Sequence, residues 1–181
     1  MVVINPADDV EAKAAVEAAI NYYGPVYLRF GRLAVPVVNT DPGYKFELGK
    51  GVQLRDGSDL TIVATGLEVS EALQAAEMLA AEGISARVIN IHTIKPIDRD
   101  IIVKAACETG CIVTAEEHSV IGGLGSAVAE VVTEECPVPV VKLGIYDRFG
   151  MSGPAAELLD IFELRAKDIV IKAKEALAKK K

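Results

Sequence analysis

The segment from Cys111 to Val132 constrains the fold of this chain more than any other part. An apolar run opens it, Glu116, Glu117 and His118 follow, and a glycine-rich loop then leads into a helical pattern of apolar residues. A buried strand, a loop and a helix that packs back on the sheet form half of a parallel α/β unit. In such sheets, ligands and partners meet the loops at the carboxyl ends of the strands. We therefore expect the charged residues and the glycines at a functional edge of a sheet.

The same succession of strand and helix recurs from residue 60 onward. Apolar runs predict strands at 60–64, 86–91, 111–115 and 138–143, and amphipathic stretches predict helices at 68–82, 96–109, 124–132, 154–159 and 166–178. Near-continuous apolar strands that alternate with helices favour a mostly parallel sheet with helices on both faces and right-handed crossovers. We therefore predict a three-layer α/β/α domain, with residues 52–55 as a short edge strand.

Residues 1–30 predict only one helix and one strand. Asn5 is a candidate N-cap and Pro6 suits the first helical position, and a strand is expected at 26–30. The helix carries an apolar stripe made of Ala12, Val16, Ala19, Ile20 and Tyr23. One helix and one strand cannot bury a core, so this region is expected to be the tail of an incomplete domain. The stripe should then pack on a neighbouring chain or be poorly ordered, and the turn signal at 41–43 places a linker within 35–51.

Composition excludes several classes of function. The formal net charge of −7 argues against nucleic acid as a partner, because phosphate backbones need basic patches. No apolar run approaches the ~20 residues of a membrane span and no signal peptide is recognisable, so we expect a cytoplasmic protein without a membrane anchor. Three cysteines and two histidines, with no C-x-x-C pair, argue against a structural zinc site. The cysteines are expected to be free thiols in a reducing compartment.

The glycines and the acidic residues of the central segment each allow two interpretations. Gly123 and Gly125 resemble part of a dinucleotide-binding loop, but the third glycine of that motif would fall at Val128. The favoured alternative is that the glycines allow a helix to pack close to its strand, or another domain to approach. The run from Glu116 to His118 could act in acid–base catalysis. Because neighbouring side chains of an extended segment point to opposite faces, a polar inter-domain contact is the favoured interpretation.

Arginines follow the predicted strand at 26–30. An arginine at the carboxyl end of a strand is well placed to bind a phosphate with its planar fork, and Arg29 and Arg32 are the candidates, although surface arginines are common. Ser126 and Ser152 lack the G-x-S-x-G context of a hydrolase nucleophile. By these arguments alone the chain is an α/β domain without a self-contained active site.

Several motifs, in their order along the chain, resemble one enzyme family. The matching runs are NPAD at 5–8, GPVYLR at 24–29, ATGLEV at 64–69, HTIKPID at 92–98, EEHSVIGGLG at 116–125 and DRFGMSG at 147–153. Together they resemble the last third of a transketolase-type, thiamine-diphosphate-dependent enzyme, most closely the C-terminal subunit of split bacterial transketolases. Deoxyxylulose-phosphate synthase and the beta chains of 2-oxoacid dehydrogenases are similar at 95–98 and at 116–117.

The resemblance implies that this chain is one part of a larger enzyme, whose cofactor binds to another part. Residues 1–38 would end the pyrimidine-binding domain, and residues 39–181 would form the third domain, a five-stranded mixed sheet with one antiparallel edge strand. Thiamine diphosphate and its divalent metal (magnesium or calcium) would bind to an N-terminal section or subunit, so no catalytic, cofactor-binding or metal-binding residue is expected on this chain. The full enzyme, a homo-oligomer such as a dimer, would transfer two-carbon ketol units between sugar phosphates of the pentose phosphate pathway.

Only some of the family's functional positions can be matched to residues of this chain. Arg32 matches the family arginine that binds the sugar phosphate, although Gly31 replaces the commoner serine or proline. Glu116, Glu117, His118, Gly122, Gly123 and Gly125 are the expected inter-domain contacts. Residues 163–165 lack the glycine and threonine that usually cap the last helix. The isolated chain is expected to be inactive; the alternatives are a free-standing interaction or regulatory module that docks through 116–125, or a part of a related synthase or dehydrogenase.

Overall fold

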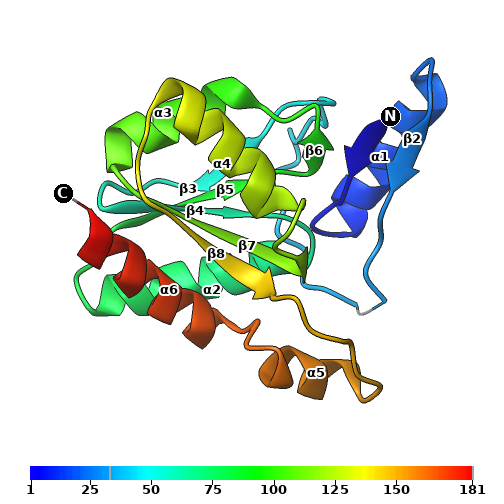
Figure 1. Ribbon diagram of the computed structural model, residues 1–181. Coiled ribbons are helices and arrows are strands. Elements are labelled where there is room, and N and C mark those ends of the chain that lie inside the picture. The colour runs from blue at the N-terminus through cyan, green and yellow to red at the C-terminus, as the bar shows by residue number, and fades with distance from the viewer. Residues whose placement is uncertain (33, 181) are drawn as a thin grey trace.

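The computed structural model describes residues 1–32 and 34–180, and its larger sheet has five strands in the order β3-β5-β4-β7-β8 (Figure 1). These strands are β3 (Val52–Arg55), β4 (Leu60–Ala64), β5 (Ala86–Asn90), β7 (Ile112–Ser119) and β8 (Val140–Ile145). β3 runs antiparallel to β5, whereas the other neighbours are parallel. The predicted fold class, including the antiparallel edge strand, is confirmed.

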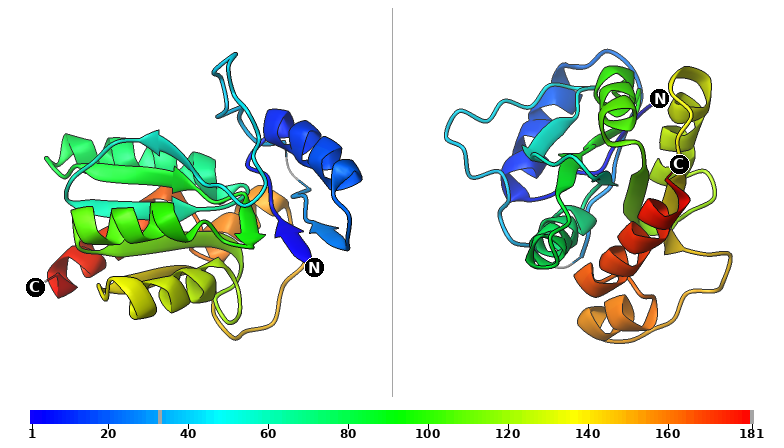
Figure 2. Two further views of the ribbon diagram at one scale, coloured as in Figure 1. Left: turned by 90° about the horizontal axis from the view of Figure 1, so that it is seen from above. Right: turned by 90° about the vertical axis from the view of Figure 1, so that its left-hand side faces the viewer.

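Helices cover both faces of this sheet (Figure 2). One face carries α2 (Glu68–Ala81), the short α5 (Ala155–Ile161) and α6 (Ala166–Lys179), and the other carries α3 (Arg99–Thr109) and α4 (Leu124–Glu135). Every residue of β4 is buried between the two layers, and each large aliphatic side chain buried there contributes about 1.5–3 kcal/mol. Within the described residues, no helix has the length and apolar character that a membrane crossing requires.

Side chains from elsewhere in the fold cap the helices where local signals are weak. α3 ends at Gly110 as the sequence predicts, with φ +70° at that glycine, but it begins at residue 99 rather than 96, because the Asp98 carboxylate caps it by accepting from the N–H of Ile101 at 3.4 Å. α6 lacks the usual glycine and threonine caps, as the sequence indicates, and its N-cap residue is Arg165. The N–H of Ala166 donates to the Glu71 carboxylate of α2 at 2.7 Å, so a neighbouring helix supplies the acceptor.

A smaller sheet joins the N-terminal residues to the rest. It contains β1 (Val2–Ile4), β2 (Val26–Leu28) and β6 (Thr93–Lys95) in the order β2-β1-β6, with α1 (Asp9–Asn21) beside it. Neither β1 nor β6 was predicted, because each has only three residues and forms by pairing with a strand far away in the sequence. The predicted start of α1 at residues 5 and 6 is also wrong. The helix is capped by Asp8, whose carboxylate accepts from the N–H of Glu11 at 2.8 Å.

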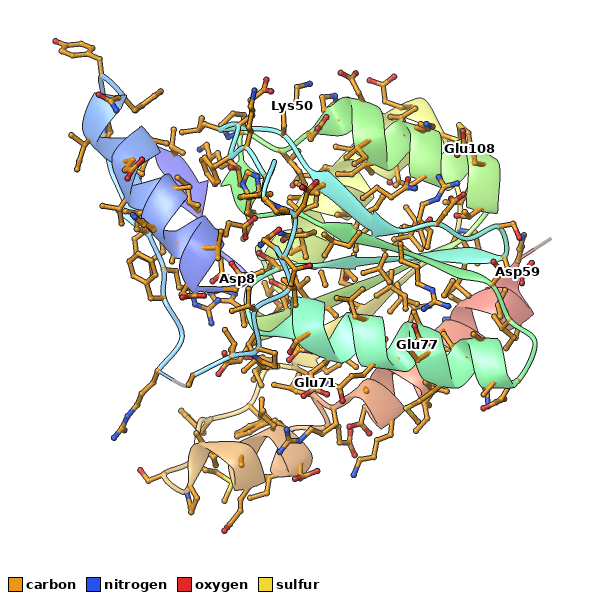
Figure 3. The ribbon with its side chains drawn as sticks, turned by 180° about the vertical axis from the view of Figure 1, so that it is seen from behind. Asp8, Lys50, Asp59, Glu71, Glu77 and Glu108 are labelled. Carbon is orange, nitrogen blue, oxygen red and sulfur yellow. A yellow bond between two sulfur atoms is a disulfide. The ribbon has the colours of Figure 1, made fainter. Side chains whose placement is uncertain are left out.

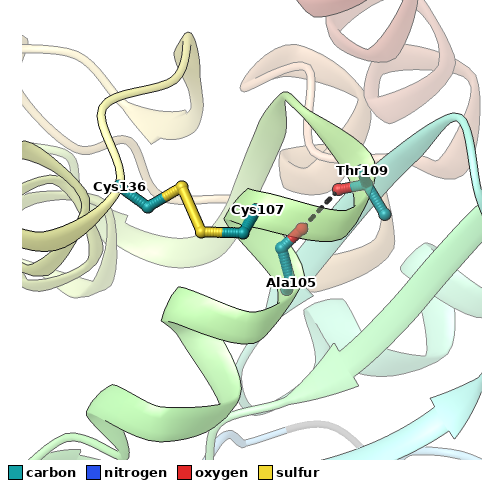
Figure 4. The surroundings of a disulfide bond; sticks show 4 residues. All are labelled: Ala105, Cys107, Thr109 and Cys136. Atoms are coloured by element: carbon teal, nitrogen blue, oxygen red, sulfur yellow. Dashed lines mark hydrogen bonds between the residues drawn. A yellow bond between two sulfur atoms is a disulfide. The ribbon is translucent and has the colours of Figure 1, made fainter.

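Two cysteines are paired, which corrects the expectation of free thiols. Cys107 of α3 and Cys136 at the end of α4 form a disulfide with their Cα atoms 6.1 Å apart (Figure 4). Cys111 is free and buried. Sequence spacing gave no signal for this pair, because 29 residues separate the two positions and only the packing of α3 on α4 brings them together.

Candidate functional site

The candidate site is the junction where residues 1–39 meet the carboxyl-end edge of the larger sheet. The N–H of Asn5 donates to the His92 carbonyl just beyond β5 at 2.8 Å. The Asn5 carbonyl accepts from the hydroxyl of Thr65, just beyond β4, at 3.2 Å. The two strand ends therefore hold the segment between β1 and α1 by its main chain.

Glu11 of α1 is fully buried at the junction. Its carboxylate accepts from the N–H of Ala7 at 2.7 Å, the hydroxyl of Tyr44 at 2.6 Å and the amide of Asn90 at 2.8 Å. Burial raises the pKa of Glu11, although these three donors oppose the shift. Because the donors come from three segments, one carboxylate ties α1 to the connecting segment and to β5. No sequence pattern indicated this role, since a glutamate in the first turn of a helix is ordinary.

Asp8 holds the segment that follows Arg32. Besides capping α1, its carboxylate accepts from the main-chain N–H groups of Val38 and Asn39, both at 2.8 Å, and from the Asn39 amide at 3.1 Å. Figure 3 shows Asp8 at the start of α1. Burial works to raise the pKa of Asp8, but these donors lower it below its usual value, so the group stays ionised.

Glu116 has its side chain turned inward, into the same domain. β7 continues through residue 119, beyond the predicted end at 115, and the carboxylate of Glu116 accepts from the N–H groups of Leu124 at 2.7 Å and Gly125 at 2.8 Å. It therefore binds the N-terminus of α4, where a negative charge is favoured. Burial raises the pKa of Glu116 while the two N–H donors oppose the shift. With 1% of its surface exposed, this side chain is not available to another domain.

The glycines allow this close approach. A Cβ added to Gly123 would lie 2.0 Å from Glu116 Oε2, and one added to Gly125 would lie 2.7 Å from Thr114 Oγ1. This geometry supports the helix-packing interpretation of both glycines. Gly122 is exposed and adopts φ +73°, a left-handed conformation that favours glycine.

Glu117 points away from Glu116, as the alternation of a strand predicts, whereas His118 lies on the same side of β7 as Glu116. Glu117 is half-buried and lines a cavity of about 230 Å³ beside α5. Its main-chain carbonyl accepts from the guanidinium of Arg29. His118 is exposed, with Nδ1 3.9 Å from Glu116 Oε2. The three side chains do not converge on one point, so the geometry gives no support to a shared acid–base cluster.

Arg32 is exposed at the edge of the junction. The preceding residue, Gly31, lines a cavity of about 410 Å³ together with Pro6, Asp9, Val35 and other residues around the start of α1. Arg32 therefore lies beside a hollow between α1 and the segment that leaves β2. No hydrogen bond to Arg32 is present among the described residues, so its guanidinium is available to a ligand.

Two further polar side chains near the junction, Glu68 and His92, are buried, which their sequence context does not predict. Glu68 is fully buried at the start of α2, and neither of its carboxylate oxygens has a donor in the described part of the chain. Burial, then the charges of Glu71 and Glu117, raise its pKa to about 9. His92 stacks on Phe46 with ring centroids 4.3 Å apart, and burial lowers its pKa to about 4. Glu68 lies in the matching run at 64–69 and His92 in the run at 92–98, but the neighbouring residues in the sequence do not indicate that these two side chains are buried.

Comparison with known proteins places this geometry in a family. The sequence model described as "Transketolase, C-terminal domain" matches residues 49–169. The 6-deoxy-6-sulfo-D-fructose transketolase subunit of Clostridium sp. (strain MSTE9) is 47% identical over 181 residues, which cover 99% of this chain and 56% of that protein. The 1-deoxy-D-xylulose-5-phosphate synthase 1 of Geobacter sulfurreducens is 42% identical over 161 residues, 87% of this chain and 25% of that protein.

A solved structure extends the likeness over the whole chain. The structure described as a split gene transketolase, inactive beta4 tetramer, has a TM-score of 0.95 and 52% identity, and the match covers 100% of this chain and 59% of that one. The chain thus spans little more than half the length of the transketolase relative and of this neighbour. The match of the family model, the identity to the relatives and the shared fold agree, and the chain belongs to the transketolase family through its C-terminal domain.

Proposed function

We propose that this chain is the C-terminal part of an enzyme that transfers two-carbon ketol units between sugar phosphates. Residues 1–38 would complete a pyrimidine-binding domain, and residues 39–181 would serve assembly as the third domain. Thiamine diphosphate and its divalent metal, magnesium or calcium, would be held by the N-terminal section or subunit. The cofactor would supply the carbanion chemistry when bound, and this chain would supply the junction and an anion-binding arginine. Among the described residues, no group of three or more His, Cys, Asp or Glu side chains could hold a metal ion.

The exposed face of α1 is the observation that carries this proposal. Ile20 is 78% exposed, and Tyr23, two residues beyond the end of the helix, is fully exposed, whereas only Glu11 and Ala15 of α1 are buried. The cluster around the smaller sheet has just Val2, Ile4 and Ala15 as buried members. An apolar helix face beside such a small core favours burial against further protein, and the rest of a pyrimidine-binding domain is the proposed cover.

Arg32 supports recognition of an anionic sugar. Its planar guanidinium can donate two parallel hydrogen bonds to a phosphate. The relative from Clostridium is named for a sulfonated sugar, whose sulfo group is also an anion with several acceptor oxygens. We therefore assign to Arg32 the anionic end of the substrate, opposite the end at which the ketol unit is transferred.

Reconstitution with the N-terminal section tests the assembly. The two parts, with thiamine diphosphate and magnesium, should transfer a ketol unit from a ketose phosphate to an aldose phosphate, and this chain alone should not. Ile20→Asp places a charge on the exposed face of α1 and should weaken binding of the N-terminal section at least about tenfold. The matched control is Ile171→Asp on α6, a residue of similar exposure far from the junction, which should bind as the wild type does.

Two results would contradict the proposal. One is micromolar binding of thiamine diphosphate by the chain alone in calorimetry with magnesium. The other is full activity of an assembly that carries Ile20→Asp. The solved neighbour, described as an inactive tetramer, supports the expectation that the chain self-associates without activity, which sedimentation of the purified chain would measure.

A synthase of the same family is the second candidate. The identity of 42% to a 1-deoxy-D-xylulose-5-phosphate synthase favours it, although the match covers only 25% of that protein. Measuring release of 1-deoxy-D-xylulose 5-phosphate against ketol transfer by the assembled enzyme separates the two activities. A free-standing interaction module would show neither activity with any N-terminal section.

A further inference from the structure

We infer that Arg29 is a positioning residue that holds Arg32 in place for the anionic end of the substrate. The inference rests on the proposed function, because it assumes that Arg32 binds that anion. Arg29 and Arg32 leave β2 on the same segment, but their surroundings differ. Arg29 is half-buried with its guanidinium engaged by the protein, whereas Arg32 is exposed.

Arg29 fastens the start of this segment to both sheets. Its main-chain N–H donates to the Ile4 carbonyl of β1 at 2.9 Å, and its guanidinium donates to the Glu117 carbonyl of β7. The position of that carbonyl is itself well defined, because the preceding residue, Glu116, is bonded to the N-terminus of α4. Arg29 therefore fixes the start of the segment to β1 and to the carboxyl-terminal part of β7.

Asp8 fastens the other end of the segment. The N–H groups of Val38 and Asn39 both donate to its carboxylate at 2.8 Å. Between the two attachments, the described residues of 30–37 form no hydrogen bond with another residue. The described residues of the segment that carries Arg32 are therefore attached by hydrogen bonds at Arg29 and, through Val38 and Asn39, at Asp8.

The Arg29 attachment is the closer of the two to Arg32. Three extended residues reach at most about 10 Å, so the Arg32 backbone stays within that distance of a fixed point. When the Glu117 contact is lost, the segment has more conformations to lose on binding, and this cost falls on the affinity for the anion. The guanidinium of Arg29 already donates to a carbonyl, which favours a role through Arg32 over direct binding of the anion.

The test uses the reconstituted enzyme with both parts and a phosphorylated acceptor aldose. Arg32→Met should raise the KM for this acceptor about a hundredfold, the loss of a bidentate charged contact. Arg29→Met should raise it about tenfold with kcat within about twofold of wild type. At a saturating concentration of the ketol donor, Arg29→Met should not alter the KM for glycolaldehyde, an acceptor without phosphate. Arg55→Met on β3, remote from the junction, is the matched control and should match wild type in all three measurements.

The double variant decides whether Arg29 acts through Arg32. Arg29→Met should add nothing once Arg32→Met is present, because no anion contact is left to position. Arg29→Lys keeps one donor for the Glu117 carbonyl and should give an intermediate KM; it also provides the measurement if Arg29→Met does not assemble. Additive losses in the double variant would overturn the inference, since Arg29 would then act independently of Arg32.

The remaining outcomes separate this inference from the proposed function. A raised KM with Arg32→Met but a wild-type KM with both Arg29 variants would refute the positioning role alone. An unchanged KM with Arg32→Met would refute the assignment of Arg32 to the anion, and the positioning role with it. A raised KM for glycolaldehyde with Arg29→Met would show a general structural role and would also overturn the inference.

Discussion

The buried carboxyl group of Glu68 makes the stability of this chain depend on pH in a defined direction. Glu68 is fully buried in the first turn of α2, without a hydrogen-bond donor among the described residues. Burial, reinforced by Glu71 and Glu117, raises its pKa from 4.5 to about 9. Between these values the folded protein holds a proton that the unfolded chain releases. The associated stability is therefore full below pH 4.5 and is lost as the pH rises toward 9.

The size of the effect follows from the proton count. One proton of difference costs about 1.4 kcal/mol per pH unit, so a rise from about pH 5.5 to about pH 7.5 should lower the free energy of unfolding by about 2–3 kcal/mol through this group. Glu68→Gln keeps the shape of the side chain but cannot ionise. The variant should therefore lack this part of the pH slope and should be more stable than wild type at about pH 7.5.

Urea unfolding of the whole chain, followed by circular dichroism at several pH values, measures both quantities. Protein concentration must be fixed, because a self-associating chain gains stability by mass action. The matched control is Glu77→Gln on the same helix, since Glu77 is exposed and bonded to Arg55 and should keep the wild-type slope (Figure 3). A Glu68→Gln variant with the wild-type slope, or with lower stability than wild type at about pH 7.5, would refute the reasoning.

Two further predictions concern the packing and the linker of the junction. Gly123→Ala would place a Cβ 2.0 Å from Glu116 Oε2 and should lower the free energy of unfolding by more than about 3 kcal/mol, whereas Gly31→Ala, with no atom within 4 Å, should be tolerated in thermal unfolding. Asp8→Ala removes a helix cap and the acceptor of the linker and should cost about 3 kcal/mol in urea unfolding, unlike Asp9→Ala at the exposed neighbouring position. Because the pKa of Asp8 is lowered, the stability that its carboxylate contributes should be present above pH 3.8 and lost as the pH falls through the folded pKa. Equal stability of Asp8→Ala and Asp9→Ala would contradict the predicted cost of losing the Asp8 carboxylate.

The larger sheet could be predicted because its strands carry their own signal. β4 is a continuous apolar run between turns, and α3 is bounded by Asp98 and Gly110, so local chemistry and final structure agree. β1 and β6 could not be predicted in this way. Each has three residues, and its pairing partner lies far away in the sequence, so only the assembled fold supplies the hydrogen bonds.

The sequence singled out residues 116–118 and the glycines after them, but it did not predict the side-chain contacts around them. Alternation along β7 indicated that Glu116, Glu117 and His118 cannot all converge, yet the sequence did not reveal that Glu116 binds the start of α4. The linker that Asp8 holds and the three donors of Glu11 were also missed. In each case a carboxylate in an ordinary helical or strand context finds donors from another segment, and single-sequence patterns carry no information on such partners.

The central place of β1 in the smaller sheet determines what a cut in the connecting segment would do. β1 pairs with β2, which precedes that segment, and with β6, which follows it. The turn at residues 41–43 is exposed and open to a protease. Hydrolysis there would leave two fragments that still share a ladder of main-chain hydrogen bonds and the Glu11–Asn90 contact. The nicked protein should therefore travel through a sizing column as one body and separate only in denaturant.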